Sequence, residues 1–186
     1  HEFMNVNCGI MDQYIIATAQ ENSAELLDCA SITHEFVPLN LGDYRFVVMN
    51  TKKQRKLADS KYNERRSQCE QGLAILQQNG VDIKDLCSLS VEDFEKYGSF
   101  IKDDVIYGRV RHCVTENQRV LDAVEALKQN DLVQLGKLLY ESHDSLKNDY
   151  EVTGMELDTL KEVASKQEGC IGARMTGAGF GGCAIA

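Results

Sequence analysis

The sequence has little of what membrane-spanning, secreted or nucleic-acid-binding proteins need. No apolar run approaches the roughly 18 residues of a membrane span, and the N-terminus lacks the basic-then-apolar layout of a signal peptide. Lys and Arg number 20 against 29 Asp and Glu, and the net charge of −9 disfavours nucleic acid and anionic membrane surfaces as partners. A small-molecule or protein partner fits this charge better.

Seven cysteines are scattered along the chain without a C-x-x-C pair, so no zinc or dithiol motif is present. An odd number of scattered cysteines is typical of a protein whose thiols stay reduced, and we expect a cytoplasmic protein. There is one proline, no low-complexity tract and no internal repeat. With 186 residues, 43% of them hydrophobic, the chain can form one ordinary domain, or one domain plus a piece of another.

The spacing of apolar residues predicts an α+β fold with a helical block in the middle. A short helix is expected first, then a few strands of a mixed sheet, then the helices, and finally two strands around a glycine-rich turn. Asn130-Asp131 supplies a turn and an N-cap between two helices. The expected helices are 11–19, 64–78, 105–128, 132–148 and 156–167, and the expected strands are 24–29, 35–39, 44–50, 170–175 and 183–186.

Asp12 follows Gly9 at the expected start of the first helix. The helix dipole and the free backbone N–H groups stabilise a negative charge there, so the carboxylate can accept or position the proton of a substrate hydroxyl. First-turn acidic residues more often only stabilise the helix end, and the spacing alone leaves both roles open.

The segment 177–182 matches G-x-G-x-x-G, but its surroundings exclude the two common meanings of that pattern. A dinucleotide-binding fingerprint leads into a helix, whereas a strand is expected here. A protein kinase would also need V-A-I-K, H-R-D and D-F-G elements, which are missing. A tight connection between strands remains, and its glycines either pack the turn or approach a ligand.

Tyr62 lies just ahead of the second expected helix, where its hydroxyl can hydrogen-bond a sugar. The Arg pair at 65–66 is equally compatible with a solvated helix face. Three histidines, His34, His112 and His143, are isolated from one another in sequence and show no metal or triad spacing, so they are interpreted as structural or surface residues.

Five longer strings, in this order, resemble the galactokinases, sugar kinases of the GHMP family. The string at 8–13 resembles C-G-I-M-D-Q, and 62–66 resembles Y-N-E-R-R. The string at 111–117 is similar to R-H-V-x-x-E-N, and 149–158 is similar to D-Y-E-V-(S/T)-x-x-E-L-D. The string at 175–183 resembles M-T-G-(A/G)-G-F-G-G-C, the third GHMP motif. Together they extend along essentially the whole chain.

Two motifs of that family are missing, namely G-R-x-N-L-I-G-E-H and the phosphate loop P-x-x-x-G-L-S-S-S-A. We therefore expect only the C-terminal half of a GHMP kinase, incomplete at its own C-terminus. Residues 1–40 would be the remnant of the N-terminal domain with the catalytic-aspartate helix, and 41–186 the C-terminal domain, a mixed or antiparallel sheet with a helical layer. Neither end resembles a natural domain boundary.

The resemblance implies an ATP-dependent sugar 1-kinase that makes galactose 1-phosphate, with Asp12 catalytic and Gly9 and Tyr62 binding galactose. Gly177, Gly179, Gly181 and Gly182 would lie near the phosphate site. ATP and Mg²⁺ would need the missing half, no metal ligand is expected within this chain, and the chain alone is expected to be inactive and to self-associate through exposed core. The alternatives are a kinase of N-acetylgalactosamine or arabinose, a non-catalytic galactose and ATP sensor on the same fold, and a plain helical interaction domain.

Overall fold

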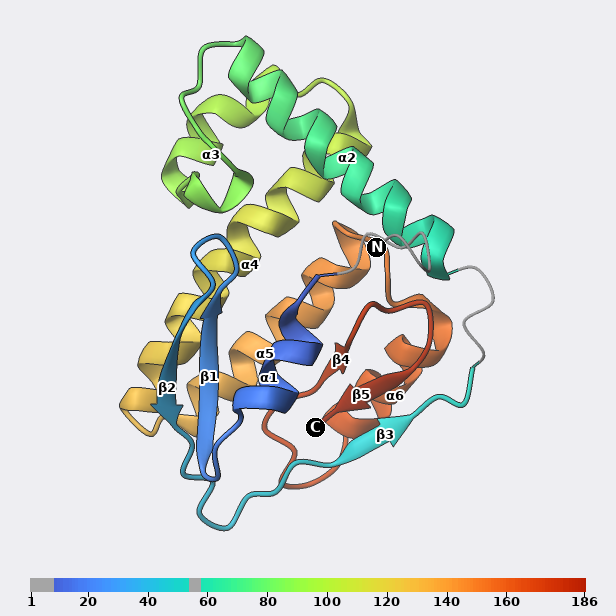
Figure 1. The fold of residues 1–186 in the computed structure, drawn as a ribbon. Helices are drawn as coiled ribbons and strands as arrows, with labels where there is room; N and C mark the ends of the chain where they lie inside the picture. The colour runs from blue at the N-terminus through green and yellow to red at the C-terminus, as the bar shows by residue number, and fades with distance from the viewer. Residues whose placement is uncertain (1–8, 54–57) are drawn as a thin grey trace.

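The computed structural model describes residues 9–53 and 58–186 (Figure 1). Cys8, the first residue of the C-G-I-M-D-Q string, lies outside the described residues, as does the part of the predicted 1–40 segment that precedes Gly9. The elements, in chain order, are α1 (Met11–Thr18), β1 (Ser23–Asp28), β2 (Thr33–Pro38), β3 (Val48–Asn50), α2 (Ala58–Gln78), η1 (Leu86–Ser88), α3 (Val91–Tyr97), η2 (Gly98–Phe100), α4 (Asp104–Lys128), α5 (Leu132–Asn148), α6 (Gly154–Ser165), β4 (Arg174–Thr176) and β5 (Cys183–Ile185).

Helices α4 and α5 both begin at capped residues. The Asp103 side chain accepts a hydrogen bond from the backbone N–H of Ile106, 2.9 Å away, at the start of α4. Asp131 does the same for Gln134 at 2.9 Å and begins α5, which confirms the predicted N-cap. The caps and the apolar periodicity together fix these helices close to their predicted bounds.

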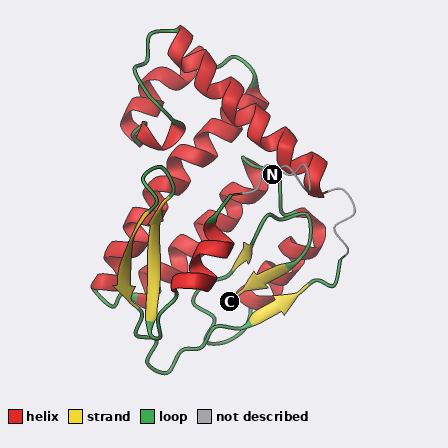
Figure 2. Cartoon of the chain, viewed as in Figure 1, coloured by secondary structure: helices red, strands yellow, loops and turns green. Residues whose placement is uncertain are grey.

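The strands form two separate antiparallel sheets, so the prediction that the early strands join one mixed sheet is wrong. β1 and β2 pair only with each other among the described strands, in the register Ser23 to Pro38. β3 instead pairs with β5, which lies between β3 and β4 (Figure 2). Ala184 at the centre of β5 faces Met49 on one side and Met175 on the other.

Two hydrophobic clusters hold the helices and the three-stranded sheet together. The first lies between α2, α3 and α4, at the end of the molecule drawn uppermost in Figure 1, and includes the fully buried Leu76 and Val110. The second joins α5 and α6 to the three-stranded sheet through Leu157, Met175 and Ala184. Helix α4 belongs to the first cluster and continues alongside α5 to contact β2. The fold is therefore α+β, as the sequence predicts.

Among the described residues, none of the helices combines the length and apolar character needed to cross a bilayer.

Candidate functional site

Asp12 lies in the first turn of α1, where its side chain is exposed. The helix starts after Ile10, whose side chain provides no cap, while the Tyr14 N–H donates to the Ile10 carbonyl at 2.9 Å. The free N–H groups of this turn therefore present a positive dipole end beside an accessible carboxylate. Gly9 is exposed, and a Cβ added to it would meet no atom of the described residues within 4 Å. Gly9 and Asp12 are thus both exposed at this end of α1.

The hairpin of β1 and β2 holds the other end of α1. The Thr18 hydroxyl donates to the carboxylate of Glu25 at 2.9 Å. The Tyr14 hydroxyl lies 2.7 Å from Nδ1 of His34. These contacts fix the direction of the helix, and hence the position of Asp12. Of the residues that make them, the sequence pointed only to His34, as a structural or surface histidine.

Tyr62 is half-buried near the beginning of α2, and the two arginines that follow it differ from one another. Arg65 is 7% exposed, and its Nε donates to the carbonyl of Tyr150 at 2.7 Å. Arg66 lies on the exposed face and pairs with Glu70 at 2.9 Å. The solvated-face interpretation therefore holds for Arg66 and is wrong for Arg65, which joins α2 to the connection between α5 and α6.

The glycine-rich turn connects the antiparallel strands β4 and β5, as predicted. All four glycines of the predicted phosphate-site set have positive φ, between 76° and 126°. A Cβ on Gly179 would lie 2.2 Å from the carbonyl oxygen of Val152. The Phe180 N–H donates to that same oxygen at 2.7 Å. The buried side of the turn is thus packed on backbone that tolerates only glycine.

The glycines of the turn differ in burial. Gly177 is exposed, whereas Gly179 and Gly181 are buried and Gly182 is half-buried. The Gly182 carbonyl accepts hydrogen bonds from the N–H and the hydroxyl of Thr51, at 2.9 and 2.8 Å. Lys53 lies against Gly181 and pairs with Glu156 at 2.7 Å, so a cation borders the turn. The turn is therefore packed at Gly179 and Gly181 and exposed at Gly177.

Two of the three predicted site segments, the start of α2 and the glycine-rich turn, contact the segment that connects α5 and α6. The third predicted segment is the start of α1. Arg65, three residues after Tyr62 on α2, contacts Tyr150, and the glycine turn contacts Val152, so both lie against the segment between α5 and α6. The described contacts of α1 go to the hairpin instead. That Asp12 faces the same pocket as Tyr62 stays a prediction.

Among the described residues no ready-made cluster of metal-ligating side chains is present. No group of three or more His, Cys, Asp or Glu side chains there is arranged to hold a metal ion. Mg²⁺ prefers octahedral oxygen coordination by carboxylates, phosphates and water.

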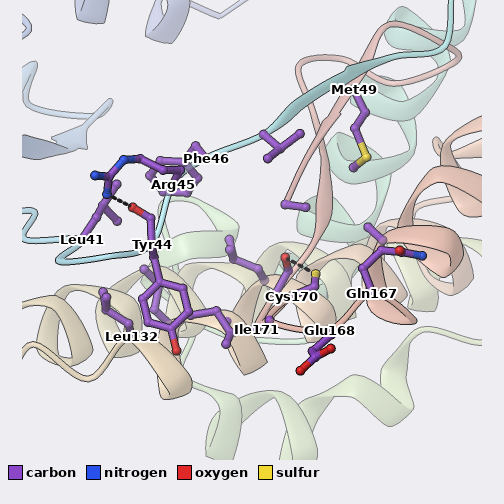
Figure 3. A pocket seen from close by; sticks show the side chains of 18 of the residues that line it. Leu41, Tyr44, Arg45, Phe46, Met49, Leu132, Gln167, Glu168, Cys170 and Ile171 are labelled. Carbon is purple, nitrogen blue, oxygen red and sulfur yellow. Dashed lines mark hydrogen bonds between the residues drawn. The ribbon is translucent and has the colours of Figure 1, made fainter.

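A cavity of about 360 Å³ lies elsewhere, between the segment 41–49, helix α5 and the loop 167–172 (Figure 3). Its lining is mainly aliphatic and aromatic, including Phe46, Met49 and Leu132. Arg45 is one of its few charged residues, and its Nη1 donates to the carbonyl of Tyr44 at 2.6 Å. None of the predicted site residues lines it, and its apolar wall has few groups that could orient a sugar.

Comparison with known proteins relates the chain to sugar kinases. Residues 123–186 match the family model described as GHMP kinases C terminal. The chain is 52% identical over 186 residues to the galactokinase of Staphylococcus carnosus, covering 100% of this chain and 48% of that protein. It is 54% identical over 184 residues to the galactokinase of Clostridium perfringens, covering 99% of this chain and 47% of that protein.

A solved structure gives the same relationship. The crystal structure of Lactococcus lactis galactokinase complexed with galactose matches with a TM-score of 0.95 at 49% identity, over 100% of this chain and 47% of that chain. The chain spans about half the length of the curated relatives it matches. The resemblance to galactokinases and the expected fold of a GHMP kinase C-terminal domain are both confirmed.

Proposed function

We infer that this chain, a homologue of the galactokinases over its full length, is part of a galactokinase. The complete protein would transfer the γ-phosphoryl group of ATP to the C1 hydroxyl of α-D-galactose and release galactose 1-phosphate. The observation that carries the proposal is the match of the whole chain, at 49% identity and a TM-score of 0.95, to a galactokinase complexed with galactose. The sister sugar kinases and the sensor are not favoured by any of these relatives.

Asp12 is the residue that we propose to act on the sugar. Its exposed carboxylate at the N-terminal end of α1 can accept or orient the proton of the C1 hydroxyl as that oxygen attacks phosphorus. Such a group typically contributes about 10² to 10⁴ in rate. Gly9, through its backbone, and Tyr62, through its hydroxyl, would hold the sugar in place.

We propose that the glycine turn shapes the phosphate side of the site. Its buried glycines fix the turn on Val152, which leaves the exposed Gly177 free to approach the missing half of the protein or a ligand. When bound, Mg²⁺ would neutralise charge on the phosphoryl oxygens. Both ATP and Mg²⁺ would be held by residues outside this chain.

We also propose a division of the chain near residue 40. The described strands before it form their own hairpin, while β3 belongs to the sheet of β4 and β5. The matched GHMP segment, residues 123–186, lies wholly in the second part. A cytoplasmic location is proposed because the six described cysteines are free thiols.

Replacing Asp12 by Asn in the full-length protein tests the assignment. We expect turnover of ATP and galactose to fall by at least about 10²-fold, because the amide cannot accept the hydroxyl proton. The thermal unfolding temperature should change little, since Asp12 is exposed. Asp82→Asn, at another exposed carboxylate, is the matched control and should keep full activity. Near-normal turnover by Asp12→Asn would overturn the proposal.

The isolated chain should form no galactose 1-phosphate from ATP and galactose, because its sequence lacks the phosphate loop that would hold the triphosphate and Mg²⁺ beside Asp12. It should also self-associate, since Ile16 is 83% exposed and Val48 68% exposed. A kinase assay and light scattering at several concentrations check both statements. Turnover by the chain alone would show that the missing half is dispensable.

A further inference from the structure

Two thiols from different helices lie side by side in the helical end of the molecule. The sulfur of Cys69 on α2 is 3.6 Å from the sulfur of Cys113 on α4. Both side chains are half-buried and pack against the first hydrophobic cluster. Among the described cysteines, no other pair of sulfur atoms is in hydrogen-bonding contact.

The helix backbones are held close beside this pair. A Cβ added to Gly72 of α2 would lie 2.2 Å from Cγ2 of Val110 on α4, so the helices approach closely because position 72 has no side chain. Cys69 stands one turn before Gly72, and Cys113 one turn after Val110. Val110 is fully buried, and the separation of the two sulfur atoms is therefore set by core packing.

The surroundings favour a thiolate at one of the two sulfur atoms. Hydrogen bonding from the Cys113 thiol, and less strongly from the hydroxyl of Tyr150 at 3.6 Å, lowers the pKa of Cys69. The guanidinium groups of Arg65 and Arg109 act in the same direction. Both donate to the side-chain oxygen of Gln68, the neighbour of Cys69, at 3.2 and 2.9 Å. Cys113, by contrast, has its pKa raised by the contact with Cys69 and by burial.

We propose that Cys69 and Cys113 form a reversible oxidation site, at which a hydroperoxide converts the two thiols into a disulfide that joins α2 to α4. The Cys69 sulfur attacks the peroxide, so an S–O bond forms and the O–O bond breaks, and the leaving oxygen takes up the Cys69 proton and departs as an alcohol or water. The Cys113 sulfur then attacks Cys69, so the S–S bond forms and the S–O bond breaks. The leaving hydroxide takes the Cys113 proton and departs as water. The two sulfurs lose two electrons, which the peroxide gains.

Reduction by a dithiol would reverse the reaction through thiol–disulfide exchange. The disulfide would also restrain the helix that carries Tyr62, because positions 62 and 69 share one face of α2. The thiol chemistry itself does not depend on the kinase activity proposed above. Failure of one proposal therefore leaves the other untouched.

The test uses the reduced 186-residue chain, one equivalent of hydrogen peroxide, alkylation of the remaining thiols and tryptic mass spectrometry. Cleavage after Lys and Arg places Cys69 in peptide 67–84, Cys113 in peptide 112–119 and Cys87 in peptide 85–96, so each thiol reports separately. We expect the alkylated forms of 67–84 and 112–119 to disappear together and one linked peptide to replace them. Dithiothreitol should restore both peptides.

Three controls make the result specific. Cys69→Ser and Cys113→Ser should each abolish the linked peptide, whereas Cys87→Ser, at an exposed thiol, should leave it unchanged. Oxidation in 8 M urea should lose the selectivity for this pair, because the fold no longer holds the two sulfurs together. Recovery of 67–84 and 112–119 as separate alkylated or overoxidised peptides from the folded chain would overturn the proposal. Linkage of either peptide mainly to another cysteine would overturn it as well.

Discussion

Gly136 of α5 and Gly172 lie back to back, so that a Cβ on Gly172 would come within 2.5 Å of the Gly136 Cα. A side chain on Gly136 would be equally crowded, because its Cβ would lie 2.1 Å from the carbonyl oxygen of Ile171. Helix backbone therefore touches the chain that leads into β4. This contact sets the three-stranded sheet on α5 and forms one wall of the apolar cavity.

Gly136→Ala should destabilise the chain although alanine is the better helix former. The helix gains about 1 kcal/mol in propensity, but the methyl group meets backbone atoms that no side-chain rotation can move. Overpacking of this kind typically costs about 1–3 kcal/mol, and backbone crowding puts this site at or above the upper end. Urea unfolding measures the change. Lys137→Ala, at the exposed neighbour, should stay within about 0.5 kcal/mol, and equal effects would contradict the contact.

The neighbouring arginines of α2 should respond differently to the same substitution. Arg65→Gln removes donors to the backbone carbonyls of Tyr150 and Glu151 in a buried place, so we expect a loss of about 1–3 kcal/mol in unfolding free energy. Arg66→Gln breaks an exposed pair with Glu70 and should cost less than about 1 kcal/mol. Chemical denaturation of both variants gives the comparison. A larger effect at Arg66 would contradict the burial of Arg65.

Apolar periodicity was sufficient for α4 and α5, because each presents one face to the core. It placed the start of α2 at residue 64, whereas this helix begins at Ala58 and so includes Tyr62. It failed for α3, a helix of seven residues in which Phe94 alone is buried. Its start is signalled locally, since the Ser90 hydroxyl accepts from the Asp93 N–H at 3.0 Å and donates to the Asp93 carboxylate at 2.9 Å. A capping signal of this kind predicts a short helix that periodicity cannot.

Strand pairing was the other part that the sequence could not predict. The apolar residues 44–50 indicate a strand, yet only Val48–Asn50 forms one, and its partner β5 lies at the far end of the chain. Segment 170–175 was also predicted as a strand, whereas the strand begins at Arg174 because Gly172 packs on Gly136. Long-range partners and close backbone approach depend on tertiary packing, which short sequence patterns do not contain.

His112 is a buried histidine that takes part in a series of side-chain hydrogen bonds. Its Nδ1 lies 3.0 Å from the Ser145 hydroxyl, which donates to Asp149 at 3.0 Å. Arg111 donates to the same carboxylate. Because the Ser145 proton points to Asp149, the hydroxyl accepts from the histidine, and the neutral ring carries its proton on Nδ1. The interpretation of His112 as structural agrees with this burial.

This arrangement predicts a loss of stability in mild acid. Burial lowers the pKa of His112 from 6.5 to about 4, and burial also lowers the pKa of His143. Between pH 6.5 and pH 4, His112 binds a proton in the unfolded chain but not in the folded one. The folded state therefore keeps its full stability above pH 6.5 and loses stability as the pH falls toward 4. The change should be on the order of 2–3 kcal/mol.

Urea midpoints between pH 7.5 and 4.5 measure the slope of this loss. His112→Gln should flatten it, whatever its effect on stability at pH 7.5, because the variant has no proton to gain at this position. Val133→Ala, at an exposed residue that carries no titratable proton, is the control and should leave the slope as it is. An unchanged slope in His112→Gln would place the acid sensitivity elsewhere.

The glycine turn allows a direct separation of packing from ligand access, because two of its glycines share a backbone conformation but differ in burial. Gly177 has φ of 76° and is exposed, whereas Gly179 has φ of 83° and lies against Val152. Alanine at either position costs about 1–2 kcal/mol for the left-handed backbone. Gly179→Ala adds a clash with a carbonyl oxygen, typically about 1–3 kcal/mol more.

The unfolding free energies of the two variants should therefore differ by about 1–3 kcal/mol, with Gly179→Ala the less stable. If the exposed end of the turn approaches the phosphates in the full-length protein, Gly177→Ala should lower turnover at a temperature where it remains folded. Gly179→Ala should lower activity only in proportion to its unfolded fraction. Equal stabilities would contradict the packing of Gly179 on Val152, and full activity of Gly177→Ala would leave the turn a structural element only.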